Sequence, residues 1–70
     1  MMPLTLAKIG EDNIIKKIGG KAEYKKFIES LGFVVGVNVK IISTIKGNLI
    51  VSVKESRVAI SKEIANKIMV

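Results

Sequence analysis

The clearest pattern of apolar and polar positions in the chain is helical and covers residues 21–31. Four apolar residues recur there at the i, i+3, i+4, i+7 spacing of one helix face: Tyr24, Phe27, Ile28 and Leu31. Gly32 follows, at the position of a left-handed C-terminal cap. Because a helix of about three turns is marginal alone, we expect the whole stripe, Tyr24 and Phe27 included, to pack on a sheet.

After Gly36 the period changes to two, which predicts half-buried strands. The strand expected over 37–45 has one apolar face, with Ile42 as an exception: Val37, Val39, Ile41 and Ile45. A hairpin turn at 46–48 leads into a returning strand over 49–53. The apolar side of that strand carries Leu49, Val51 and Val53. A second turn over 54–56 and a short strand over 58–60 complete a meander.

The two ends of the chain supply the remaining elements. Residues 9–13 read as a turn, and the strand after it, over 13–18, points Ile15 and Ile18 inward before it ends at a glycine pair. Ser61 can cap a single helical turn over 62–66. The apolar segment 67–70 is expected to be a closing strand.

Five short strands within 70 residues favour closure, because a closed sheet has no exposed edges. We therefore predict one domain over residues 1–70, mostly β, folded as a small five-stranded SH3-like barrel. One α-helix is inserted after the first strand and a short helical turn precedes the last. The chain has no cysteine, so apolar burial must provide its stability.

The residue types argue against catalysis. The chain has no histidine and no cysteine, so the usual activated nucleophiles are missing, and Glu11-Asp12 is the only adjacent acidic pair. We predict that the protein is not an enzyme and has no cofactor. Iron(II) sites favour imidazole together with carboxylate, so Fe(II) or another divalent metal would need oxygen ligands alone or a site completed by a partner.

The charge balance is basic, with 12 lysines and arginines against six acidic residues and a formal net charge of +6. The lysines are scattered, which is typical of a solvated surface. Single-strand binders add aromatic platforms to a basic groove, and here Tyr24 and Phe27 are assigned to the core. The amino-terminal residues lack the features of a signal peptide, and no apolar run is long enough to span a bilayer, so we expect a cytoplasmic protein.

Residues 32–36, Gly-Phe-Val-Val-Gly, form an apolar loop between the helix and the long strand. One interpretation places Phe33 in the mouth of the barrel. The other makes the loop a docking surface with Val34 and Val35 exposed.

Several fragments together resemble the ferrous iron transport protein A family (FeoA-like). They cover nearly the whole chain: Pro3-Leu4, Ile9-Gly10-Glu11, Ile15, Ile18-Gly19-Gly20, Leu31-Gly32-Phe33 with Gly36, Ser56-Arg57-Val58-Ala59-Ile60, and Ala65 to Val70. The resemblance implies an SH3-like barrel related to the carboxy-terminal domain of iron-dependent repressors. It also implies a cytosolic accessory protein that contacts the cytoplasmic part of a membrane Fe(II) transporter with a GTP-binding domain. Val35 stands where the family commonly has proline, and Asn13 and Glu55 stand where glycine is common.

The leading hypothesis is therefore a transport accessory module. We assign apolar partner contact to Phe33, Val34 and Val35, and electrostatic steering to Lys25, Lys26 and Arg57. One alternative is a stand-alone metal-binding regulatory domain, which titration with iron(II) or manganese(II) would detect. The other is a small barrel that binds nucleic acid, which predicts a steep fall of affinity with salt.

Overall fold

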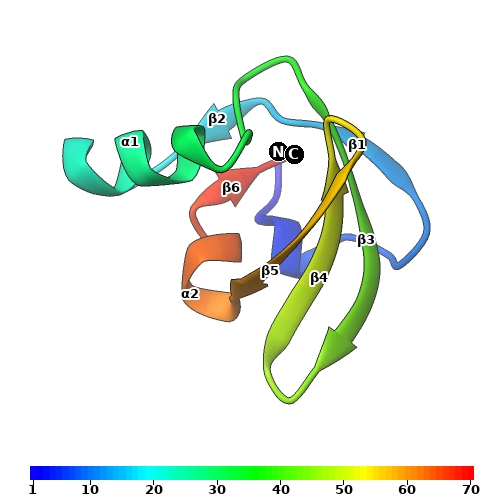
Figure 1. Cartoon of the computed structure of the whole chain (residues 1–70). Coiled ribbons are helices and arrows are strands. Elements are labelled where there is room, and N and C mark those ends of the chain that lie inside the picture. Colours follow the sequence, from blue (N-terminus) through cyan, green and yellow to red (C-terminus); the bar gives the residue numbers. More distant parts are fainter.

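In the computed structural model, which describes residues 1–70, two small antiparallel sheets pack around one core (Figure 1). The larger sheet has the strand order β1-β3-β4-β5, and the smaller pairs β2 with β6. The elements in chain order are η1 (Leu4–Leu6), β1 (Asp12–Ile14), β2 (Lys17–Ile18), α1 (Ala22–Ser30), β3 (Asn38–Ile45), β4 (Asn48–Val53), β5 (Ser56–Ser61), α2 (Lys62–Ala65) and β6 (Ile68–Met69).

The predicted first strand is divided into two, so the structure has six strands. β1 pairs with β3, whereas β2 pairs with β6. Ile15 lies between them, where its N–H donates to the Val37 carbonyl at 3.0 Å and its carbonyl accepts from the Gly36 N–H at 2.8 Å. One extended segment thereby passes from one sheet to the other. The predicted fold class, a mostly β SH3-like domain with one inserted helix, is confirmed. The predicted closure of five strands into one sheet without edges was wrong, because the six strands form two sheets and β5 is an edge strand of the larger one.

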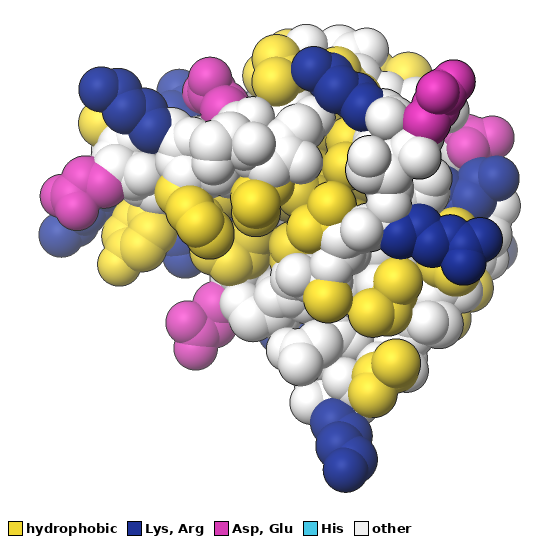
Figure 2. Space-filling view, in the orientation of Figure 1, with side chains coloured by type: hydrophobic (Ala, Val, Ile, Leu, Met, Phe, Trp, Pro, Cys, Tyr) yellow, Lys and Arg dark blue, Asp and Glu magenta, His cyan; other side chains and the backbone are white.

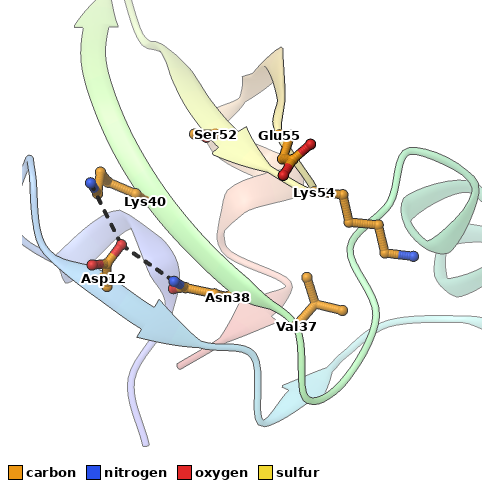
Figure 3. Close-up of a pocket in the computed structure, with 7 residues that line it drawn as sticks. All are labelled: Asp12, Val37, Asn38, Lys40, Ser52, Lys54 and Glu55. Carbon is orange, nitrogen blue, oxygen red and sulfur yellow. Dashed lines mark hydrogen bonds and ion pairs between the residues drawn. The ribbon is translucent and has the colours of Figure 1, made fainter.

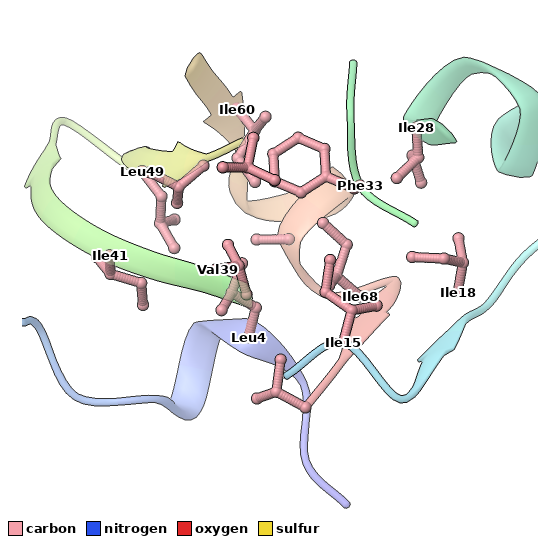
Figure 4. Packing of buried hydrophobic residues seen from close by; sticks show 14 residues of the cluster. Leu4, Ile15, Ile18, Ile28, Phe33, Val39, Ile41, Leu49, Ile60 and Ile68 are labelled. Atoms are coloured by element: carbon pink, nitrogen blue, oxygen red, sulfur yellow. The ribbon is translucent and has the colours of Figure 1, made fainter. Parts of the chain in front are cut away.

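The core contains only hydrophobic side chains (Figure 4). Its 14 buried residues are Leu4, Ile15, Ile18, Ile28, Phe33, Val39, Ile41, Leu49, Val51, Val53, Ile60, Ala65, Ile68 and Val70. The inward positions predicted for Ile15 and Ile18 are confirmed, as is the apolar face of β4. No polar side chain is buried, so only the backbone groups of the interior need hydrogen bonds to offset their desolvation.

A β-bulge in β3 corrects the predicted face of Ile45. Ile41 pairs with Val51 while Ser43 pairs with Ile50, so Ile42 is the extra residue. An extra residue shifts the alternation by one, which moves every later side chain to the opposite face. Ile45 is consequently 54% exposed and not part of the core.

The prediction that the whole apolar stripe of α1 is buried was wrong. Ile28 is fully buried, but Tyr24 is 47% and Phe27 52% exposed. The physical reason is visible in Figure 1, where the amino-terminal half of α1 extends beyond the two sheets and only its carboxy-terminal end meets the core. Lys67 partly covers Tyr24, with its Nζ 5.0 Å from the ring centroid, which is a cation–π distance.

Both hairpins of the meander turn through two residues with positive φ, as type I′ turns do. The β3–β4 turn uses Lys46 and Gly47, and the β4–β5 turn uses Lys54 and Glu55, with φ values of 48° and 64°. Glu55 therefore adopts the left-handed conformation that favours glycine. Positive φ at a non-glycine residue costs on the order of 1 kcal/mol.

The capped helical turn and the closing strand that were predicted at the carboxyl end are also present. The Ser61 hydroxyl accepts a hydrogen bond from the Ile64 N–H at 3.3 Å, which is the expected cap of α2. The Met2 N–H donates to the Val70 carbonyl at 2.9 Å, and the Val70 N–H donates back at 2.8 Å. These bonds join the two ends of the chain beside β6.

Candidate interaction surface

The loop between α1 and β3 divides into one buried and two exposed apolar side chains. Phe33 is fully buried in the core (Figure 4), so its assignment to partner contact is corrected: its ring faces the interior and not the surface. Val34 and Val35 are 36% and 58% exposed. A hydrogen bond from the Val37 N–H to the Val34 carbonyl, 3.0 Å long, fixes the turn that presents them.

The three residues assigned to steering are all exposed, but they do not form one cluster. Lys25 and Lys26 are on α1, whereas Arg57 is on β5. The only salt bridge in the structure joins Lys40 to Asp12 at 3.6 Å. Lys25, Lys26 and Arg57 therefore make no ion pair within the chain.

A second apolar surface, which we call the open side, was not predicted. Under this name we group the exposed part of the α1 stripe, Tyr24 and Phe27, with three half-buried apolar residues that pack against the core, Leu31, Val58 and Ile64. In Figure 2 hydrophobic side chains gather beneath α1 and continue toward β5 and α2. The spacing along α1 did reveal the stripe. What it could not reveal is that the barrel is too small to cover a helix of this length.

The outer face of the large sheet holds a shallow depression of about 290 Å³ (Figure 3). It is lined by Asp12, Val37, Asn38, Lys40, Ser52, Lys54 and Glu55. Asp12 accepts from the Asn38 side-chain amide at 3.4 Å and pairs with Lys40, while Glu55 stands apart from it (Figure 3). The charges are mixed, and no group of three or more acidic, histidine or cysteine side chains in the structure could hold a metal ion.

None of the helices has the length and apolar character that crossing a membrane requires.

Comparison with known proteins connects this geometry to one family. A protein of Methanocaldococcus jannaschii named Fe(2+) transport protein A is 40% identical over 70 residues, which is 100% of this chain and 85% of the relative. The crystal structure of an iron uptake regulatory protein (FeoA) superposes with a TM-score of 0.89 at 28% identity, covering 97% of this chain and 90% of the other.

A further solved structure supports the fold alone, because its sequence is more distant. It is the Stenotrophomonas maltophilia FeoA complexed with zinc, described as a procaryotic SH3 domain protein. It matches with a TM-score of 0.84 at 19% identity, over 99% of this chain and 88% of the other. The FeoA domain model itself matches residues 2–70. With a family match over nearly its whole length and a relative at 40% identity, the chain belongs to the FeoA domain family.

Proposed function

We propose that this protein is a cytoplasmic accessory protein of ferrous iron transport that binds the cytoplasmic region of a membrane Fe(II) transporter carrying a GTP-binding domain. Membership of the FeoA domain family over residues 2–70 supports the transport role. The family is non-enzymatic, in agreement with the prediction made from the missing nucleophiles and bases. The protein would thus act through contact alone.

The observation that carries the proposal is the pair of exposed valines in a loop whose neighbouring phenylalanine is buried. Phe33 anchors the loop in the core, while Val34 is 36% and Val35 58% exposed. Adjacent exposed aliphatic side chains gain free energy when a partner covers them, at roughly 25 cal/mol per Å² of apolar surface. We assign the central apolar contact to Val34 and Val35.

The basic residues that make no ion pair would act on the rate of association with the partner. Lys25, Lys26 and Arg57 have no internal ion pair, so their charge is available to a partner. Charges at the rim of an interface change the association rate more than the final affinity. Neutralising them should slow association and weaken its dependence on salt, with a smaller effect on dissociation.

The test is a pull-down of the host transporter's cytoplasmic domains at physiological salt, with this chain as bait. The Val34→Asp variant should lose binding. Ile45→Asp is the control, because Ile45 is also aliphatic, is 54% exposed against 36% for Val34, and lies at the far end of the β3–β4 hairpin. If Val34→Asp bound as well as the wild type, the loop would not be the contact. If the wild type failed to bind, the accessory role by direct contact would be wrong.

The exposure of Tyr24 and Phe27 also favours a second candidate function, nucleic-acid binding. These aromatic rings were assigned to the core, but they lie in water on a helix that also carries Lys25 and Lys26. Aromatic stacking and lysine contacts are the two elements of single-strand binding. A labelled single-stranded oligonucleotide should then bind at low salt with an affinity that falls steeply as salt rises. Absence of binding at low salt would remove this candidate.

A further inference from the structure

We infer that the free edge of β5 is a docking site for an extended segment of another protein, in which aliphatic side chains alternate with acidic ones. This inference does not depend on which protein supplies the segment. It is carried by the register of the sheet, by the apolar open side next to the strand, and by the charge along its edge.

The register identifies the backbone groups that face outward. β4 and β5 are joined by the two-residue turn Lys54-Glu55, so the flanking pair Val53–Ser56 exchanges hydrogen bonds. Hydrogen-bonded residue pairs then recur at every second residue along β5. The backbone N–H and C=O groups of Val58 and Ile60 therefore point toward β4. The N–H groups of the alternate residues point away from it, and so do their C=O groups except that of Ser61, which as the N-cap carbonyl accepts the first hydrogen bond of α2. The alternate residues are Arg57, Ala59 and Ser61.

This edge is unoccupied within the chain. β5 is the last strand of its sheet, and β6 pairs with β2 instead. Arg57, Ala59 and Ser61 are all exposed, and none takes part in the backbone hydrogen bonds outside the regular elements. β5 contains no proline and no bulge over its six residues, so its outward backbone groups are regularly spaced for pairing with another strand.

The open side determines which side chains an added strand should have. Residues of such a strand that lie beside Val58 would share the inner face of the sheet. That face is completed by half-buried apolar residues, Leu31 and Ile64, packed against the core. The open side also includes the exposed stripe of α1, on which Phe27 is 52% exposed. Aliphatic side chains at every second position of the added strand would cover this surface (Figure 2).

The charges determine the remaining positions and argue against a second copy of this chain as the occupant. Arg57 is the one charged residue of the edge strand and lies on its outer face, while each end of the strand carries one basic and one acidic residue, Lys54 and Glu55 before it and Lys62 and Glu63 after it. None of these five side chains makes an ion pair. Two copies, each with a net charge of +6, would repel one another, whereas acidic side chains opposite Arg57 would be attracted.

The experiment uses the intact chain and a synthetic probe, an acetylated and amidated hexapeptide of alternating glutamate and valine, followed by amide NMR. In the free protein the Arg57, Ala59 and Ser61 amides should exchange quickly with solvent. Adding the peptide should protect these amides and shift their resonances. A peptide with lysine in place of glutamate should bind at least about tenfold more weakly. Shifts elsewhere without protection at β5, or equal binding of the two peptides, would overturn the inference.

Two variants at one position separate the backbone contact from the side-chain contact. Ala59→Pro removes the outward N–H while leaving the β4–β5 bonds intact, as edge prolines do, and it should abolish protection of β5. Ala59→Val keeps the N–H and should retain it. Arg57→Glu keeps the strand unbroken and should reverse the preference between the peptides, so the inference can be tested even if Ala59→Pro unfolds. Binding unaffected by Ala59→Pro in a folded protein would contradict it.

Discussion

The apolar face of β4 and the apolar stripe of α1 differ in how completely they are buried. On β4, Leu49, Val51 and Val53 are each at most 3% exposed, whereas on α1 only Ile28 of the four-residue stripe is completely buried. Full burial of an aliphatic or aromatic side chain is worth roughly 1.5–3 kcal/mol, so the barrel carries most of the stability. The outer half of α1 contributes less to folding and is therefore available for binding.

The largest effect that separates the two regions is expected for Phe33→Ala. Phe33 is the largest fully buried side chain, and truncation of a buried phenylalanine typically costs about 3–5 kcal/mol through lost contacts and a residual cavity. A domain of this size has little stability to lose. Urea denaturation followed by circular dichroism should show a variant that is largely unfolded at 37 °C.

Val35→Ala is the control for that measurement, because it truncates a neighbouring residue of the same loop that is 58% exposed. It should change the free energy of unfolding by less than about 0.5 kcal/mol. A Phe33→Ala variant as stable as Val35→Ala would mean that the loop does not anchor in the core.

The second test removes the cap that joins the barrel to α2. Ser61→Ala leaves the Ile64 N–H without its hydroxyl acceptor and should cost about 1 kcal/mol. Ser61→Asp restores an acceptor and should recover most of the loss, again measured by urea denaturation. Equal stability of Ser61→Ala and wild type would show that water replaces the hydroxyl, as the exposed setting of this 3.3 Å bond allows.

The third test is expected to raise the free energy of unfolding, whereas the first two lower it. Replacing Lys54-Glu55 by Asn-Gly fits the residues to a type I′ turn, which they now occupy at positive φ. The substitution should raise the free energy of unfolding by on the order of 1 kcal/mol. The same change at Lys46-Gly47 is the control, because that turn already has glycine at its second position, and the gain should be smaller. A destabilised Asn-Gly variant would indicate that the Lys54 or Glu55 side chain makes a contact that matters for folding.

The patterns of neighbouring residues correctly predicted the structural features that depend only on those residues. The alternation over 49–53, the turns at both hairpins and the Ser61 cap all follow from a few neighbouring residues. Their positions in the structure agree with the prediction. The FeoA-like resemblance was confirmed by the comparisons because it draws on fragments from the whole chain.

The errors concern features that depend on distant parts of the chain. Ile45 changed face because of the bulge at Ile42, three residues earlier in β3, and a run such as Ile41-Ile42 does not show which residue is extra. Phe33 had two interpretations, and only the packing of the core decides between them. Tyr24 and Phe27 were assigned to the core because a stripe shows which residues share a face, not how much of that face another element covers.

Among the main variants the smallest effect on stability, and the sharpest test of the contrast, is expected for Phe27→Ser, since Val35→Ala serves only as a control. Phe27 shares the stripe with the buried Ile28, yet it is 52% exposed. Its replacement should lower the free energy of unfolding by less than about 1 kcal/mol, since much of the ring is already in water. Ile28→Ser is the matched change one residue along, and it should cost several kcal/mol because it also buries a hydroxyl without a partner. Urea denaturation of both variants measures the difference directly. Comparable losses would mean that α1 is held along its full stripe and that the open side is part of the folded core. A large difference, combined with weakened binding of the glutamate–valine peptide by the stable Phe27→Ser variant, would assign the outer half of α1 to partner contact.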